Sequence, residues 1–454
     1  MPTSPSVTTN AAAVSIPTVS VDLPSGHTDL HAPSEAINLD FDSAGHLYAT
    51  HALHAFAARC PPQLVRWAIE RYSAPGDVVL DPMCGSGTTL VEAGLCGRVP
   101  WGADIDPLAR LLALAKATLV DPALILAAAA DLAVRLGTPD LDPSWRPQLT
   151  GLTYWFREDV ANDLARLRLA IRQADVGEEL RRLLWAVYSS LIVARTSVAN
   201  ARDLAHSRHH YRAWETAPDV GDRFLKQLRR AARQMTEFRV RLQESGHPTP
   251  QPRLVGADAR ALDIAPDGVD LIFTSPPYCT ALDYTRAHSF SVAWLADVLA
   301  MSSDDYRTLA RRYIGSERAP LAEANAAQPL PPASGHALVD TAVTALREHP
   351  KRAWIVSRYF RDMVTVLQEC GRVLRPGGHA VLVVCPSNIR KVRIPTHEVF
   401  AELAPAVTGG GLHLAALHER TIHDRRRLMP YLEASFGERM RTEYVLVLRK
   451  GAQN

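Results

Sequence analysis

The sequence predicts an α/β fold in which a helical domain is inserted into an open, mainly parallel sheet. Short apolar runs that follow turn residues alternate with helical patterns, as parallel strands and their crossover helices do. The stretch between Asp104 and Asp258 is far longer than one crossover requires, and its pattern is that of successive helices. The expected organisation is a flexible tail over residues 1–35, a sheet domain over residues 36–120 and 251–454, and a helical insertion over residues 121–250.

The first expected strand leads into a glycine turn. Residues 77–80 form a short apolar run behind the turn residues 73–76, which predicts a buried strand. Cys84-Gly85-Ser86-Gly87 follows as a turn in which larger side chains would keep a ligand away from the backbone. A helix is expected to begin at Thr88, so the local pattern is strand, glycine turn and helix.

A carboxylate at the tip of the next expected strand suits a ribose. Residues 99–103 form a second apolar run that ends at Asp104, and Asp106 can cap the helix that follows with Pro107 as its first residue. One ionised carboxylate about twenty residues beyond a glycine turn can accept hydrogen bonds from both hydroxyls of a ribose diol. The same pattern would also fit an ordinary strand-turn-helix unit without a ligand.

Two residues favour S-adenosylmethionine over a dinucleotide at this turn. Leu90 occupies the place of the third glycine in the dinucleotide fingerprint. Asp81 lies beside the turn, where its charge would repel a pyrophosphate but would tolerate the ammonium and sulfonium charges of S-adenosylmethionine. We therefore expect S-adenosylmethionine as the cofactor.

A second motif, Ser275-Pro276-Pro277-Tyr278, follows the apolar strand expected at residues 269–273. Open α/β sheets bind ligands at the carboxyl ends of their strands. The Ser275 hydroxyl and the Pro276 carbonyl could accept the hydrogens of an exocyclic amine and localise its lone pair. The two prolines would make the loop rigid, and Tyr278 offers a face on which a base can stack. Alone, the motif could equally be a rigid surface turn.

Taken together, these stretches resemble the S-adenosylmethionine-dependent amino methyltransferases of DNA. The matching stretches are residues 81–89, 102–107, 256–259 and 270–278, and their order spans most of the chain. The resemblance implies a Rossmann-like sheet of seven strands, in which Asp104 holds the ribose, Asp258 meets the adenine amine, and Ser275, Pro276, Pro277 and Tyr278 form the catalytic loop that binds the target base. The cofactor-binding residues that it implies are Asp81, Met83, Cys84, Gly85, Gly87, Thr88, Asp104, Ile105, Asp258 and Ala259.

An upstream segment, residues 51–63, resembles the part of the family that touches the amino-acid end of the cofactor. Phe56, Arg59, Pro61 and Pro62 match that segment, whereas Ala57 stands where relatives often have proline.

The target base is expected to be cytosine, methylated at N4, because serine at the first motif position resembles the cytosine-N4 branch more than the adenine-N6 branch. Adenine stays open, since a hydroxyl and a carboxylate can both accept from an amine. The motifs are also compatible with an RNA guanine-N2 methyltransferase and with a binding protein that has no catalytic activity. Cys279 is expected to be a buried loop residue and not the thiolate of a C5 methylation, because Tyr278 and not proline precedes it.

Methylation of duplex DNA requires extrusion of the base, and therefore predicts a basic surface near the site. Over residues 151–250 basic residues outnumber acidic ones, and nearly all of them are arginine. Arg195, Arg202 and Arg208 belong to the densest basic run, although a helical buttress on the sheet would also explain it. The segment after Tyr278 offers Tyr284 and Arg286 as substrate-binding residues, and Arg311, Arg312, Tyr313 and Arg318 as a later recognition loop.

The remaining patterns complete the fold and bound the function. The 454 residues, 47% of them hydrophobic and 22% charged, suffice for one large core and a satellite domain. The tail lacks the features of a secretion signal, so we expect a cytoplasmic, nucleoid-associated protein with reduced cysteines. The six cysteines have no zinc-binding spacing, so we expect no structural metal. The enzyme is expected to act either alone or beside a restriction endonuclease as its partner, and DNA is its expected substrate. Further helices are expected to begin at Asp121 and to cover residues 155–173, 178–199, 220–244 and 353–374, with strands at 380–384 and 444–448.

Overall fold

A computed structural model of the chain describes residues 39–41, 47–57, 59–192, 196–197, 217–249, 251–279, 284–318, 336–421 and 442–452. It has the predicted α/β fold, with a seven-stranded sheet in the order β3-β2-β1-β4-β5-β9-β8. β1 to β5 run parallel to one another, and β9 is antiparallel to both of its neighbours. The strands are β1 Val78–Asp81, β2 Val99–Gly102, β3 Arg253–Leu254, β4 Val269–Thr274, β5 Leu374–Val384, β8 Leu412–Thr421 and β9 Thr442–Lys450.

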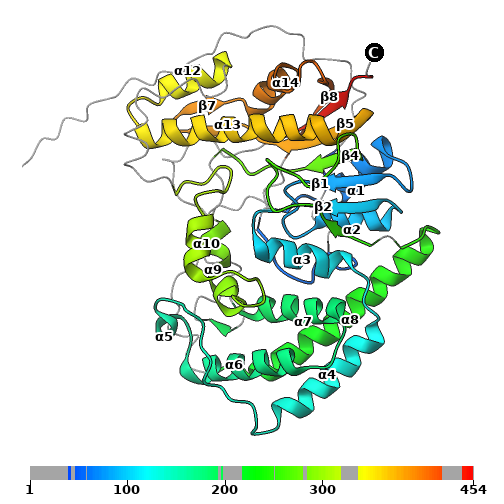
Figure 1. Ribbon diagram of the computed structural model, residues 1–454, viewed down its shortest axis with the longest axis vertical. Helices are drawn as coiled ribbons and strands as arrows, with labels where there is room; N and C mark the ends of the chain where they lie inside the picture. The colour runs from blue at the N-terminus through cyan, green and yellow to red at the C-terminus, as the bar shows by residue number, and fades with distance from the viewer. Residues whose placement is uncertain are drawn as a thin grey trace, which may run out of the picture.

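Both faces of this sheet are buried, which explains why its central strands are almost wholly apolar. Side chains alternate between the faces. On β4, Leu271 and Phe273 pack toward α1 (Pro62–Tyr72) and α2 (Thr88–Leu95), whereas Ile272 packs toward α13 (Pro350–Val373) and α14 (Thr396–Val407). Figure 1 shows α13 lying along one side of the sheet, with α1 and α2 on the other.

The helical insertion forms a layer of its own against the sheet domain. Its helices are α4 Pro122–Leu136, α5 Leu152–Trp155, α6 Glu158–Gln173, α7 Glu178–Leu191 and α8 Val220–Glu244. In Figure 1 they lie beyond α3 (Pro107–Ala117) on the side away from α13. Leu108 and Leu112 of α3 share one hydrophobic cluster with Leu183 and Leu184 of α7, so the insertion is packed firmly on a helix of the sheet domain.

Further elements connect the sheet to the site or lie at its margin. α9 (Tyr284–Trp294) and α10 (Ser303–Leu309) follow β4, and α12 (Ala337–Ala345) precedes α13. β6 (Ser387–Ile389) and β7 (Val392–Ile394) form a separate two-stranded ribbon. In the part of the chain described, no helix combines the length and apolar character needed to cross a membrane.

Most of the predicted elements match, with four differences. The helix expected over residues 178–199 ends at Leu191. β5 begins at Leu374, so the stretch 375–378, expected to end the preceding helix, belongs to the strand. α6 begins at Glu158 and not at Trp155, because the short helix α5 ends there. The strand β8 was not expected, because its residues Leu412–Thr421 contain few β-branched side chains.

Candidate active site

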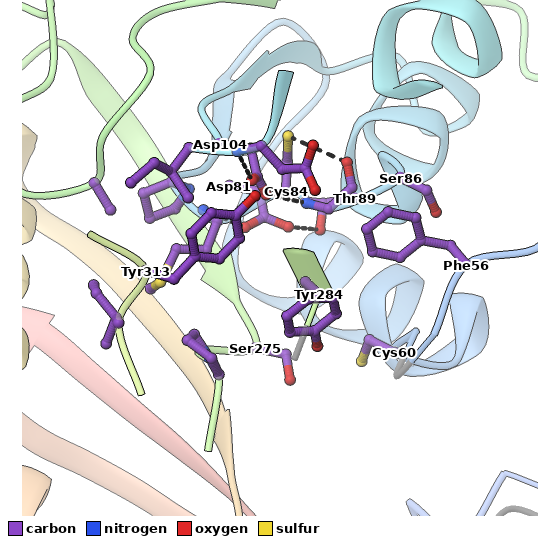
Figure 2. A pocket seen from close by; sticks show the side chains of 18 of the residues that line it. Phe56, Cys60, Asp81, Cys84, Ser86, Thr89, Asp104, Ser275, Tyr284 and Tyr313 are labelled. Carbon is purple, nitrogen blue, oxygen red and sulfur yellow. Dashed lines mark hydrogen bonds between the residues drawn. The ribbon is translucent and has the colours of Figure 1, made fainter. Parts of the chain in front are cut away.

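A pocket of about 960 Å³, including its open mouth, lies at the carboxyl ends of β1, β2 and β4. Figure 2 shows Asp81 and Asp104 in this pocket together with Phe56, Ser275 and Tyr284. Of the cofactor-binding residues expected from the sequence, all except Gly87 line it: Asp81, Met83, Cys84, Gly85, Thr88, Asp104, Ile105, Asp258 and Ala259. The two motifs, almost two hundred residues apart, therefore face one space.

The glycine turn has the backbone conformation that only glycine adopts readily. Gly85 and Gly87 have φ values of 49° and 84°. A Cβ atom on Gly87 would lie 2.7 Å from Cα of Ala113 in α3, whereas one on Gly85 would meet the Phe56 ring at 3.2 Å. Gly87 thus serves the close packing of α2 on α3, and Gly85 serves the approach of Phe56 over the pocket.

Asp104 is held rigidly at the tip of β2. Its Oδ2 accepts a hydrogen bond from the Gly85 backbone N–H at 2.8 Å, and its Oδ1 accepts one from the Asp106 N–H at 2.8 Å. Burial, followed by the charge of Asp106, raises the pKa of Asp104 to about 7. The lone pairs that remain on the carboxylate are available to a ligand.

Asp81, at the end of β1, is a second carboxylate in the pocket, and its side chain is buried. It accepts hydrogen bonds from the Thr89 hydroxyl at 2.6 Å and from the Met83 N–H at 3.1 Å. Burial raises its pKa to about 6. Among the ion pairs of the described residues, none includes Asp81 or Asp104, so the pocket suits a ligand that carries positive charge.

The far end of the pocket is built around Asp258. Its Oδ2 pairs with the guanidinium of Arg260 at 2.8 Å and with that of Arg312 at 3.2 Å. Burial opposes ionisation of Asp258, but its hydrogen bonds with Arg260 outweigh burial and lower its pKa. Arg312 and Tyr313, which belong to the second expected recognition segment, line this pocket together with Arg260. Their expected role in recognition stays a prediction.

Ser275 and Pro277 line the pocket, whereas Pro276 and Tyr278 lie outside its lining. The Ser275 hydroxyl donates to the backbone carbonyl of Val383 at 3.3 Å, and this leaves the oxygen lone pairs for an incoming donor. The Tyr278 hydroxyl donates to Glu443 at 2.9 Å. The loop is thus tied to both β5 and the start of β9.

The helix after the catalytic loop brings Tyr284 into the pocket. Its ring stacks on Phe56 with 6.1 Å between centroids and an angle of 24°. His288 is buried, and its Nδ1 lies 2.5 Å from Oδ2 of Asp106, so it joins α9 to the loop after β2. Arg286 is exposed on the same helix. Arg195, Arg202 and Arg208 lie outside the described residues, so their expected role stays a prediction.

Cys279 does not suit nucleophilic catalysis. The side chain is fully buried, and burial raises the pKa of its thiol far above the ordinary value. This agrees with the expected structural role and leaves the serine-proline loop as the acceptor side of the site.

Comparisons with known proteins agree with this geometry. A family model described as DNA methylase, of the N6 and N4 type, matches residues 34–113. The Type II methyltransferase M.MvaI of Kocuria varians is 24% identical over 377 residues, which are 78% of this chain and 80% of that protein. These matches support the DNA amino methyltransferase family for this chain, N6 and N4 types together. The Type II methyltransferase M.MjaII of Methanocaldococcus jannaschii is 39% identical to this methyltransferase over 66 residues, 14% of this chain and 12% of that protein.

Among solved structures, a SAM-dependent methyltransferase from Methanosarcina mazei is 10% identical, with 85% of this chain and 97% of that chain covered and a TM-score of 0.29. The fold of this methyltransferase follows from its own strand order. Its cofactor is S-adenosylmethionine. The carboxylates of Asp81 and Asp104, which have no ion-pair partner among the described residues, fit a ligand that brings an ammonium and a sulfonium.

Proposed function

We propose that this protein methylates the exocyclic N4 amine of cytosine at a specific sequence in DNA. The observation that carries the proposal is the shared pocket: Ser275 and Pro277 line the same space as Asp81 and Asp104. The methyl donor and the acceptor amine would then lie side by side in one pocket, and neither would have to move to another site. Their alignment would supply much of the rate acceleration.

In this proposal the cofactor end of the pocket divides into three parts. Asp104 accepts from the ribose hydroxyls, because its backbone hydrogen bonds leave lone pairs free. Asp81 offsets the positive charge of the amino-acid end. Asp258 and the Ala259 backbone lie where the adenine would bind, although Arg260 and Arg312 already occupy part of the Asp258 carboxylate. Bound S-adenosylmethionine supplies an electrophilic methyl group.

The acceptor loop would make the amine nucleophilic. The lone pair of an exocyclic amine is delocalised into the ring, so a group that accepts the amine hydrogens favours the form that attacks. Because Ser275 donates its own proton to the Val383 carbonyl, its oxygen faces the pocket as an acceptor, and the Pro276 carbonyl is the proposed second acceptor. The displacement needs no covalent enzyme intermediate, which agrees with the inert Cys279.

Duplex DNA hides this amine, so the proposal includes extrusion of the base. Tyr278 and Tyr284 would provide aromatic faces beside the loop, and the exposed Arg286 would contact the backbone of the DNA. We further propose that residues 121–250 form a DNA-recognition domain. A companion restriction endonuclease is part of the proposal because the two relatives are named Type II methyltransferases.

Nucleoside analysis tests the proposal. Purified protein is incubated with labelled S-adenosylmethionine and unmethylated DNA, and the digested nucleosides are separated by chromatography and mass spectrometry. We expect N4-methylcytosine in the wild type and almost none in the Ser275→Ala variant. N6-methyladenine would move the target to adenine. Methylated guanine from an RNA substrate, with DNA untouched, would reject the proposal.

A further inference from the structure

The hydroxyl of Tyr278 takes part in a chain of polar contacts that the proposed reaction does not use. It donates to Oε1 of Glu443 at 2.9 Å, although the two residues are 165 positions apart. Burial and the Glu443 charge raise the pKa of Tyr278 well above its ordinary value, so the phenol stays protonated and remains the donor. The direction of this hydrogen bond is thereby fixed.

Glu443 is in turn paired with a buried cation. Its Oε2 lies 3.3 Å from Nε of Arg420 on β8, and the side chains of Arg420 and Glu443 are only 2% and 15% exposed. A guanidinium this deeply buried requires a counter-charge. Arg420 thus pairs with one oxygen of Glu443, and the other oxygen accepts the hydrogen bond from Tyr278.

The same strands hold the other end of the catalytic loop. Ser275 donates to the carbonyl of Val383 on β5, and β5 pairs with β9 in a register that places Val384 opposite Tyr444, next to Glu443. The loop is thus fixed at its serine by β5 and at its tyrosine by β9. A loop fixed at both ends presents its aromatic ring in one orientation.

We propose that Glu443 is a positioning residue that holds the ring of Tyr278 in the orientation in which it stacks on the target base, with Arg420 as its counter-ion. This inference rests on the proposed function, because it requires that an extruded base stacks on the ring of Tyr278. Without the hydrogen bond the ring would rotate among orientations, and base binding would have to restrict it again. The cost falls on DNA binding and not on cofactor binding.

Steady-state kinetics on unmethylated DNA test the inference, with Tyr278→Phe, Glu443→Ala, Glu443→Gln and the double variant Tyr278→Phe/Glu443→Ala. We expect Tyr278→Phe and Glu443→Ala each to raise KM for DNA about ten-fold, with little change in the affinity for S-adenosylmethionine. The double variant should be no worse than the worse single variant, because both remove one hydrogen bond. Glu443→Gln should recover part of the loss, since its amide oxygen can still accept from the phenol.

Glu419→Gln is the matched control. It removes the same charge from an exposed position on the neighbouring strand, opposite Tyr444, and should behave as the wild type. Tyr278→Phe leaves the Glu443–Arg420 pair intact, so it tests the inference even if Glu443→Ala lowers the melting temperature. Wild-type KM in Tyr278→Phe, or additive effects in the double variant, would overturn it. A wild-type protein that methylates no DNA would overturn the proposed function, and this inference with it.

Discussion

Acidification should weaken S-adenosylmethionine binding, because it protonates the two carboxylates that give the pocket its negative charge. Asp104 has its pKa raised to about 7 and Asp81 to about 6, in both cases chiefly by burial. A cationic ligand binds best when both are ionised. Because both pKa values are higher in the folded, ligand-free protein than in the unfolded chain, the folded protein holds these two protons more tightly. The stabilisation that these protonated groups give is therefore greatest at low pH and is lost as the pH rises through about 6 to 7.

The size of the effect follows from the fraction of protein with both groups ionised. At about pH 8 nearly all molecules are in this form. At about pH 6 roughly one in ten Asp104 carboxyls and about half of the Asp81 carboxyls are ionised. If only the doubly ionised form binds, the apparent Kd should be about twenty-fold higher at pH 6 than at pH 8.

Calorimetric titration across this pH range, in two buffers of different ionisation enthalpy, measures both the Kd and the protons released on binding. We expect weaker binding and fewer released protons in Asp104→Asn. The control is Asp131→Asn, which replaces an exposed carboxylate on α4 away from the pocket and should bind as the wild type does. A Kd that is constant between pH 6 and pH 8, or that rises toward pH 8, would refute this reasoning.

Four further substitutions test separate parts of the site. Ser275→Ala should lower kcat about a hundred-fold while the affinity for S-adenosylmethionine is kept, as single-turnover rates and calorimetry would show. Gly87→Ala should lower the free energy of unfolding by about 1 to 3 kcal/mol. Thermal unfolding should show a smaller loss for the control Gly76→Ala, because Gly76 has a similar positive φ but no atom within 4 Å of the new Cβ. Cys279→Ala should keep methylation activity at a cost of about 1 kcal/mol in stability, and an inactive, folded variant would restore the thiolate mechanism. Arg286→Glu should weaken DNA binding and reduce its salt slope by about one, whereas equal binding at all salt concentrations would remove Arg286 from the interface.

The parts of the fold and site that the sequence predicts well are those in which a local pattern determines a local structure. The strand at Val78–Asp81, the glycine turn and the Asp106 helix cap follow from neighbouring residues, and all are present. The carboxyl ends of parallel strands share one edge of a sheet, so Ser275 could be expected to meet Asp104 across a long insertion.

The parts that the sequence does not predict depend on contacts between distant segments. Nothing near Tyr278 in the chain indicates that its hydroxyl donates to Glu443, because the contact arises from the pairing of β9 with β5. The place of Arg312 beside Asp258 is likewise not evident from the sequence, because their pairing joins two segments 54 residues apart. The packing role of Gly87 required the position of Ala113 in α3.

The contacts around Asp106 connect the cofactor side of the pocket to the acceptor side. Its backbone N–H holds Asp104, and its Oδ2 accepts from His288 at 2.5 Å and from the Tyr306 hydroxyl at 3.2 Å. α9 and α10 are therefore positioned by the loop that presents the proposed ribose-binding carboxylate. Because Tyr284 lies on α9, a displacement of Asp104 would also move an aromatic wall of the proposed base site. In the proposed function one connected set of side chains would hold both cofactor and base, which favours direct transfer between them over transfer between separate sites.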